Sequence, residues 1–215
     1  MLDVSKLVNL QELSIGSCPA LTRIVEFEEL PHVHALTIRF CPVLDIKELL
    51  DVAQLQLRCL FLESGAKEST RCFDLSQLTC LENLIVKRFQ WPFGLIKLTR
   101  LKTLDLRDGG TPNPVIFLPW VEDFVIKNAR LMQQIDLGQY SHLTKVTIHH
   151  FADLDLLGRE NFAGELNITT SAGVINTPQE PVQAFAVEES QGRTLNPEAS
   201  EAFWMQMFRY CCGFG

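Results

Sequence analysis

The chain lacks the long apolar run that a transmembrane helix needs. No uninterrupted apolar stretch among its 215 residues approaches about 18 residues. The N-terminal segment, MLDVSKLVNLQEL, also lacks the basic stretch followed by an apolar stretch that forms a secretory signal peptide. We therefore expect a cytoplasmic protein that does not enter a membrane.

Recognised catalytic motifs are absent as well. The sequence contains no G-x-S-x-G, H-E-x-x-H, C-x-x-C pair or phosphate-binding G-x-x-x-x-G-K-[ST] loop. The stretch SHLTKVTIHHFADLD holds the adjacent residues His149 and His150. Their side chains would point apart at the end of a strand, so exposed sheet histidines are predicted in place of a zinc site. We expect no enzyme activity, no metal and no cofactor.

Neither the cysteines nor the overall charge indicates a special chemistry. The seven cysteines are odd in number and follow the repeat described below, which predicts reduced thiols in a cytosolic chain. The formal charge is −7, distributed as −5 over residues 1–84, +4 over 85–150 and −6 over 151–215. The basic middle part could orient a partner. The overall acidity and the scarcity of aromatic residues among the basic ones argue against nucleic acid.

The dominant feature is an internal repeat. Residues 7–24 read LVNLQELSIGSCPALTRI and residues 30–47 read LPHVHALTIRFCPVLDIK, at an offset of 23 residues. Both fit the leucine-rich repeat frame L-x-x-L-x-x-L-x-L-x-x-C-x-x-L. An apolar-x-apolar pair recurs along the chain at intervals of 19 to 24 residues. The pairs are Leu13/Ile15, Leu36/Ile38, Leu60/Leu62, Leu84/Val86, Leu104/Leu106, Phe124/Ile126, Val146/Ile148, Leu166/Ile168 and Phe185/Val187.

These pairs predict the fold. Side chains alternate across a strand, so both members of a pair face the same way, and stacked neighbours bury them in one continuous core. We predict an α/β leucine-rich repeat solenoid over residues 1–192, a horseshoe with a parallel concave sheet of about nine strands and irregular convex segments. Asn196-Pro197-Glu198 is a good helix start and predicts an amphipathic C-terminal helix or cap within residues 193–215.

The residues between and after the pair members would be exposed on the concave face. There they would form a basic ladder beside an apolar one, which suits a protein partner with acidic and hydrophobic features. The alternative is a solvated face neutralised by Asp105, Asp108, Glu122 and Asp123. On the binding hypothesis, Lys87→Glu combined with Arg107→Glu should abolish partner capture and leave the fold intact. The predicted contacts are Arg39, Lys87, Arg107, Lys127 and His149 for charge, with Phe61, Ile85 and Val125 for apolar contact.

A Cys-Pro-x-Leu element follows the first two strands, in SCPAL at 17–21 and FCPVL at 40–44. It resembles the leucine-rich repeat region of plant intracellular immune receptors of the nucleotide-binding type. The resemblance implies a ligand-sensing and autoinhibitory module in defence that works with additional N-terminal domains. Nucleotide hydrolysis is not implied, because the chain has no phosphate-binding loop. The alternatives are the substrate-recruiting repeats of an F-box ubiquitin-ligase adaptor and a structural scaffold without a selective ligand.

Overall fold

The computed structural model describes residues 1–50, 56–65, 73–90, 92–109, 118–127, 134–149, 155–170 and 173–177. All of them belong to one compact unit, Met1–Pro178, and the second unit is Gln179–Gly215. The predicted ninth strand at Phe185 to Val187 and the predicted C-terminal helix lie outside the described residues. The predicted boundary at residue 192 stays a prediction.

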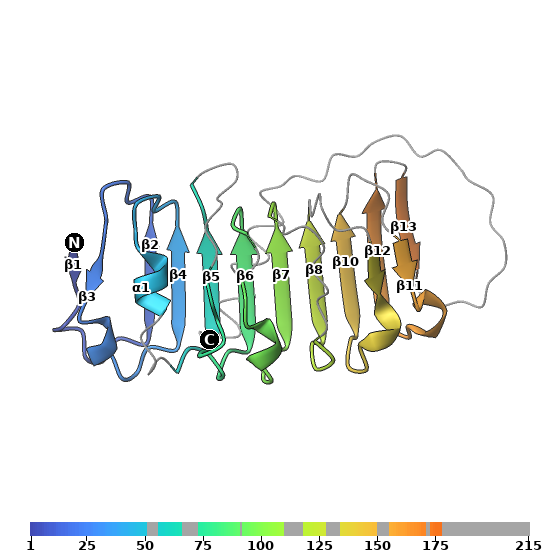
Figure 1. Ribbon diagram of the computed structural model, residues 1–215, viewed down its shortest axis with the longest axis horizontal. Helices are drawn as coiled ribbons and strands as arrows, with labels where there is room; N and C mark the ends of the chain where they lie inside the picture. The colour runs from blue at the N-terminus through green and yellow to red at the C-terminus, as the bar shows by residue number, and fades with distance from the viewer. Residues whose placement is uncertain are drawn as a thin grey trace. The chain divides into compact units, whose positions relative to one another are not determined.

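In the described part of the chain, nine strands lie side by side in one sheet, as Figure 1 shows. The first eight are parallel and follow one another in chain order, which confirms a parallel-strand repeat solenoid. These eight are β2 (Glu12–Gly16), β4 (Ala35–Arg39), β5 (Cys59–Glu63), β6 (Asn83–Lys87), β7 (Thr103–Arg107), β8 (Asp123–Lys127), β10 (Lys145–His149) and β12 (Glu165–Thr170).

The ninth strand of the sheet was not predicted. It is β13 (Gly173–Thr177), which pairs antiparallel with β12. Only residues 171–172 separate the two strands. A connection that short can form a hairpin but not the crossover that a parallel strand requires. The repeat frame therefore describes β2 to β12, and the sheet ends with a reversal of chain direction.

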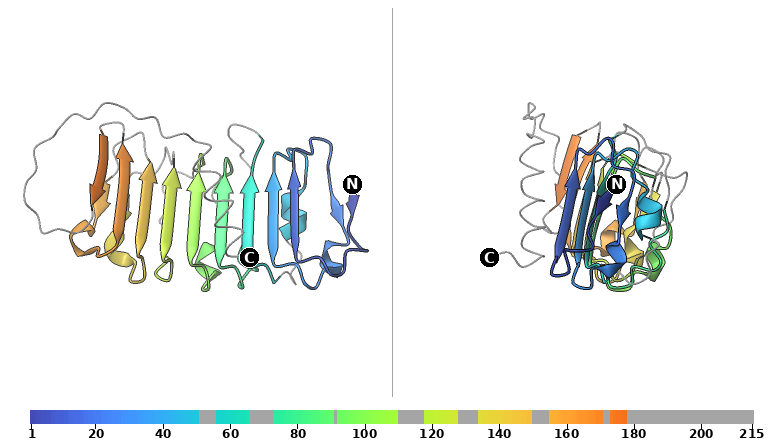
Figure 2. Two further views of the ribbon diagram at one scale, coloured as in Figure 1. Left: turned by 180° about the vertical axis from the view of Figure 1, so that it is seen from behind. Right: turned by 90° about the vertical axis from the view of Figure 1, so that its left-hand side faces the viewer.

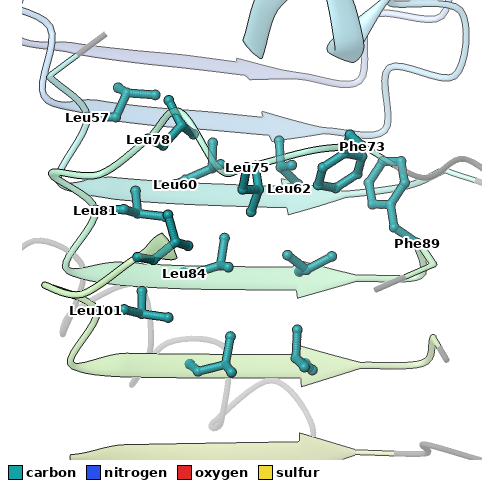
Figure 3. Packing of buried hydrophobic residues seen from close by; sticks show 14 of the residues in the cluster. Leu57, Leu60, Leu62, Phe73, Leu75, Leu78, Leu81, Leu84, Phe89 and Leu101 are labelled. Carbon is teal, nitrogen blue, oxygen red and sulfur yellow. The ribbon is translucent and has the colours of Figure 1, made fainter. Parts of the chain in front are cut away.

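The core lies on one side of the sheet and is built from the predicted pairs. Leu60, Leu62 and Leu84 are fully buried and point to the same side (Figure 3). The leucines three residues before each pair, Leu57 and Leu81, are buried against them. Each turn thus contributes three apolar side chains to the space between neighbouring turns, and no turn could bury them alone.

The described parts of the segments between the strands contain little helix. They lie together on the core side of the sheet (Figure 2, right). Among the described residues no helix is long enough to cross a bilayer. The short elements are β1 (Leu2–Asp3) paired with β3 (Ile24–Val25), β9 (Gln134–Asp136) paired with β11 (Asp155–Leu157), α1 (Ile46–Leu50) and the 3-10 turns η1 (Phe27–Glu29), η2 (Leu95–Lys97), η3 (Leu137–Gln139) and η4 (Arg159–Asn161).

A left-handed residue follows several of the parallel strands. Ser17, Phe40, Arg88 and Asp108 have φ between 53° and 60°, a conformation that costs non-glycine residues about 1 kcal/mol or more. Each donates its backbone N–H to the last carbonyl of the next strand, as in Ser17 to Arg39 at 3.0 Å. The left-handed turn therefore continues the hydrogen-bond ladder one residue beyond each strand.

The frame cysteines stabilise the same turn. The thiol of Cys18 donates to the carbonyl of Gly16 at 3.3 Å, and the thiol of Cys41 donates to the carbonyl of Arg39 at 3.3 Å. Both contacts span two residues, and Cys41 is buried. The cysteine of the repeat frame thus satisfies a backbone carbonyl group in the turns of these two repeats.

Candidate protein-binding face

The side of the sheet opposite the core carries three columns of side chains, and we name it the ladder face. Its columns come from the first, third and fifth positions of the eight parallel strands, in register. The first column is Glu12, Ala35, Cys59, Asn83, Thr103, Asp123, Lys145 and Glu165; the middle column is Ser14, Thr37, Phe61, Ile85, Asp105, Val125, Thr147 and Asn167; the last column is Gly16, Arg39, Glu63, Lys87, Arg107, Lys127, His149 and Thr169.

The structure brings all eight predicted contact residues together on the ladder face. The five chosen for charge stand in the last column and the three chosen for apolar contact stand in the middle one. Lys87, Arg107 and Lys127 are register neighbours on consecutive strands. Glu63 stands between Arg39 and Lys87, so an acidic residue interrupts the basic ladder.

The predicted exposure of the apolar residues is wrong. Phe61 and Ile85 are each 5% exposed and Val125 is 2% exposed. Part of the cover of Phe61 comes from the neighbouring strands. The Arg39 guanidinium carbon lies 5.4 Å from the ring centroid of Phe61, and the Lys87 ammonium lies 5.0 Å from it. Long basic side chains lay their apolar stems over a ring and place the charge on its face.

Glu63 holds Arg39 in this position. Its carboxylate is 4% exposed, and its Oε2 accepts a hydrogen bond from Nε of Arg39 at 2.9 Å. Its Oε1 lies 3.9 Å from Nη1 of Arg88. The sequence pattern missed Arg88, because this residue directly follows β6 in the left-handed turn and not in a strand position. A partly buried ion pair of this kind orders the side chains of three neighbouring turns.

Arg107 is paired with Asp105 and is not available as a free cation. Nε of Arg107 donates to Oδ1 of Asp105 at 2.7 Å, and Nη2 donates to Oδ2 at 2.5 Å. Asp105 is fully buried, and Arg107 and Lys87 are each 7% exposed. The expectation that these two basic residues are exposed is therefore wrong. The neutralisation proposed as the alternative is confirmed for Asp105.

Lys127 and His149 are half-buried and continue the last column beyond Arg107. Burial, followed by the positive charge of Arg107, lowers the pKa of Lys127. Burial, followed by Lys127 and then Arg107, lowers the pKa of His149 from its ordinary 6.5. His149 is therefore neutral at pH 7. Its assignment as a charged contact is corrected, since it offers a hydrogen-bonding ring in place of a cation.

The first column of the ladder face carries a second polar group, of which the sequence pattern singled out only Asp123. Asp123 is partly buried, its Oδ1 has no hydrogen-bond partner among the described residues, and burial raises the pKa of its carboxyl to about 6. Farther along the first column, Lys145 Nζ lies 3.3 Å from Glu165 Oε2. Asn167 donates to Glu165 Oε1 at 2.7 Å. Extending the alternation one step before each apolar pair would have found this column.

The buried carboxyl of Asp123 should make stability fall as pH rises from about 4 to about 6. The folded state keeps the proton up to a pKa of about 6, whereas the unfolded chain releases it near pH 4. The stabilisation is therefore present below about pH 4 and lost by pH 6, about 1 to 2 kcal/mol after allowing for solvent screening. Asp123→Asn should flatten this slope and be the more stable protein at pH 7, as measured by urea unfolding at several pH values.

Glu122→Gln is the matched control for that experiment, because Glu122 is the exposed neighbour of Asp123 and its change also removes one carboxylate. If Asp123→Asn and Glu122→Gln alter the pH dependence equally, the burial of Asp123 does not cause the effect.

The ladder face is rich in charge but holds no assembled metal site. Within the described ranges, no three His, Cys, Asp or Glu residues are grouped so that they could hold a metal ion. The geometry defines a parallel-strand repeat solenoid that presents one polar, charge-segregated sheet face. No protein-family model matches the chain, and neither the curated proteins nor the solved structures contain a significant match.

Proposed function

We propose that the chain is a non-catalytic protein-recognition module that binds its partner on the ladder face. The observation that carries this proposal is the separation of charge across that face. The first column holds three acids and one lysine, whereas the middle and last columns hold four cations and two acids. Charge arranged in this way orients an incoming segment and rejects the opposite orientation.

The residues that contact the partner are those of the basic side that solvent reaches. Lys127 and His149 are half-buried, and the Arg39 side chain is 25% exposed. Lys87 and Arg107 do not contact the partner directly. The Lys87 ammonium lies over the ring of Phe61, and Arg107 donates a hydrogen bond to Asp105. The partner segment should accordingly be acidic where it meets Lys127 and should carry a hydrogen-bonding group for His149.

Within this proposal, the chain belongs to the leucine-rich repeat class. The burial of the frame leucines and the turn contacts of Cys18 and Cys41 support that assignment. The Cys-Pro-x-Leu resemblance further supports a role as the recognition region of a plant intracellular immune receptor. The free thiols of Cys18, Cys41 and Cys80 are compatible with the reducing cytoplasm.

A display experiment tests the binding proposal. The chain is used as bait for a random peptide library, and the selected peptides are synthesised and titrated by calorimetry. We expect sequences that combine acidic residues with hydrogen-bonding side chains, with affinity that weakens as salt rises. Lys127→Glu should reduce that affinity about tenfold or more, because it reverses the accessible charge of the basic side.

Lys97→Glu is the control. Lys97 is exposed in η2, outside the strands that form the ladder face, and its substitution makes the same change in net charge. Peptides that bind the Lys127→Glu protein as tightly as the parent would exclude the ladder face as the recognition surface.

A further inference from the structure

The first turn of the solenoid exposes side chains that the second turn buries. Leu7 is 45% exposed, whereas Leu30, at the same position of the frame, is 4% exposed. The next frame positions differ in the same way. Leu10, Leu13 and Leu21 are only partly buried, whereas Val33, Leu36 and Leu44 are at most 2% exposed. The cause is topological, because β2 is the terminal strand of the nine-stranded sheet. The residues before it cover the first turn only at β3, which pairs with β1.

The backbone of β2 is open on the same side. Gln11 accepts a hydrogen bond from Ala35 N–H, and Ser17 donates to Arg39, so the odd-numbered residues of this strand face β4. Backbone groups alternate in direction along a strand. Glu12, Ser14 and Gly16 therefore direct their N–H and C=O groups away from β4, where no described strand pairs with them.

This edge also lacks the features that keep edge strands apart. Natural edge strands are usually protected by lysine, proline or a bulge. The β2 sequence is ELSIG, with neither lysine nor proline, and it pairs with β4 in uninterrupted register. Ser14 is exposed at its centre. An unprotected edge beside partly exposed leucines is a surface on which another strand can be added.

We propose that this surface binds β2 of a second copy of the chain, in antiparallel register about a two-fold axis at Ser14. In that register Ser14 meets its own counterpart, and Glu12 faces Gly16. The groups that point outward from these residues then meet complementary groups, as in an antiparallel ladder. Leu13 faces Ile15 across the core side, and no like charges oppose each other. The resulting dimer has one continuous sheet that runs through both copies.

The mass of the full chain tests this proposal. Under reducing conditions, sedimentation from about 1 to 200 µM should show a reversible dimer, since association follows mass action. Ser14→Lys should weaken the dimer about tenfold or more, because it places two ammonium groups opposite each other at the axis. Ser14→Thr, which adds no charge, should leave the dimer unchanged.

Amide hydrogen exchange gives a second, independent readout on the unaltered chain. Leu13 and Ile15 should be protected at every concentration, because their amides face β4. Glu12, Ser14 and Gly16 should gain protection only as the dimer forms. A protein that stays monomeric with rapid exchange at these three amides overturns the proposal and leaves the edge for a strand of another polypeptide. A dimer that persists in Ser14→Lys overturns it as well.

Discussion

Replacing Asp105 with alanine is expected to lower the free energy of unfolding by about 3 to 5 kcal/mol, the usual cost of removing one member of a buried ion pair. Asp105 is fully buried and accepts hydrogen bonds from Nε and Nη2 of Arg107, which is itself 7% exposed. Alanine would remove the carboxylate and leave the guanidinium in the same low-dielectric surroundings. Urea denaturation followed by circular dichroism measures the loss.

The double variant Asp105→Leu with Arg107→Met distinguishes the cost of leaving one buried charge without its partner from the cost of changing these two positions. It removes both charges and fills the volume with apolar groups, so it should recover most of the stability lost by the single change. A loss below about 1 kcal/mol in Asp105→Ala would place this pair among the exposed ones, which contribute little.

The same ion pair corrects one expectation drawn from the sequence. Arg107→Glu would set a second carboxylate beside buried Asp105, so we expect the variant Lys87→Glu with Arg107→Glu to destabilise the fold as well as to alter binding. A variant that tests binding must change Lys127, which is half-buried, and not the buried cations.

Truncating Leu84 to alanine should lower the free energy of unfolding much more than the same change at Leu13, its counterpart in the first turn. Leu84 is fully buried between neighbouring turns, and such a truncation costs about 2 to 5 kcal/mol. Leu13 occupies the same frame position in β2 but is only partly buried. Leu13→Ala should therefore cost about 1 kcal/mol, since less area is lost and the site can relax.

Equilibrium unfolding of the two variants, measured side by side, tests whether a frame leucine contributes less stability when its turn is at the end of the stack. Equal losses would mean that both turns are covered on both sides, which contradicts the position of β2 at the end of the sheet. The comparison needs dilute protein, because association at the β2 edge would add cover to Leu13.

Strand placement could be predicted from the sequence because it depends on spacing alone. Each apolar pair, such as Leu84 and Val86, requires a strand that turns both side chains to one side. β13 could not be predicted in this way, because its sequence GVINT follows β12 by a hairpin and not by a full repeat. The left-handed turns at Phe40 and Arg88 were also invisible, since no glycine marks them.

The composition of the ladder face was predictable, but its exposure was not. The alternation of side chains along a strand places Phe61, Lys87 and Arg107 on that face, but it does not determine how exposed they are. The burial of Phe61 and Lys87 involves a contact between different strands, in which the Lys87 ammonium lies 5.0 Å from the centroid of the Phe61 ring. The pKa of Asp123 likewise depends on how deeply its neighbours enclose it, and a pattern of residue types does not contain that depth.

Among the described residues, each parallel strand pairs with the corresponding strands of the preceding and following repeats, and this arrangement has a consequence for how the protein can change over evolution. Duplication or deletion of a segment of about one repeat would insert or remove a whole turn and leave every remaining interface of the same kind. The length of the solenoid can then change by whole turns, and the number of strands that contribute residues to the ladder face changes with it. Insertions of other lengths must be absorbed by the segments between the strands.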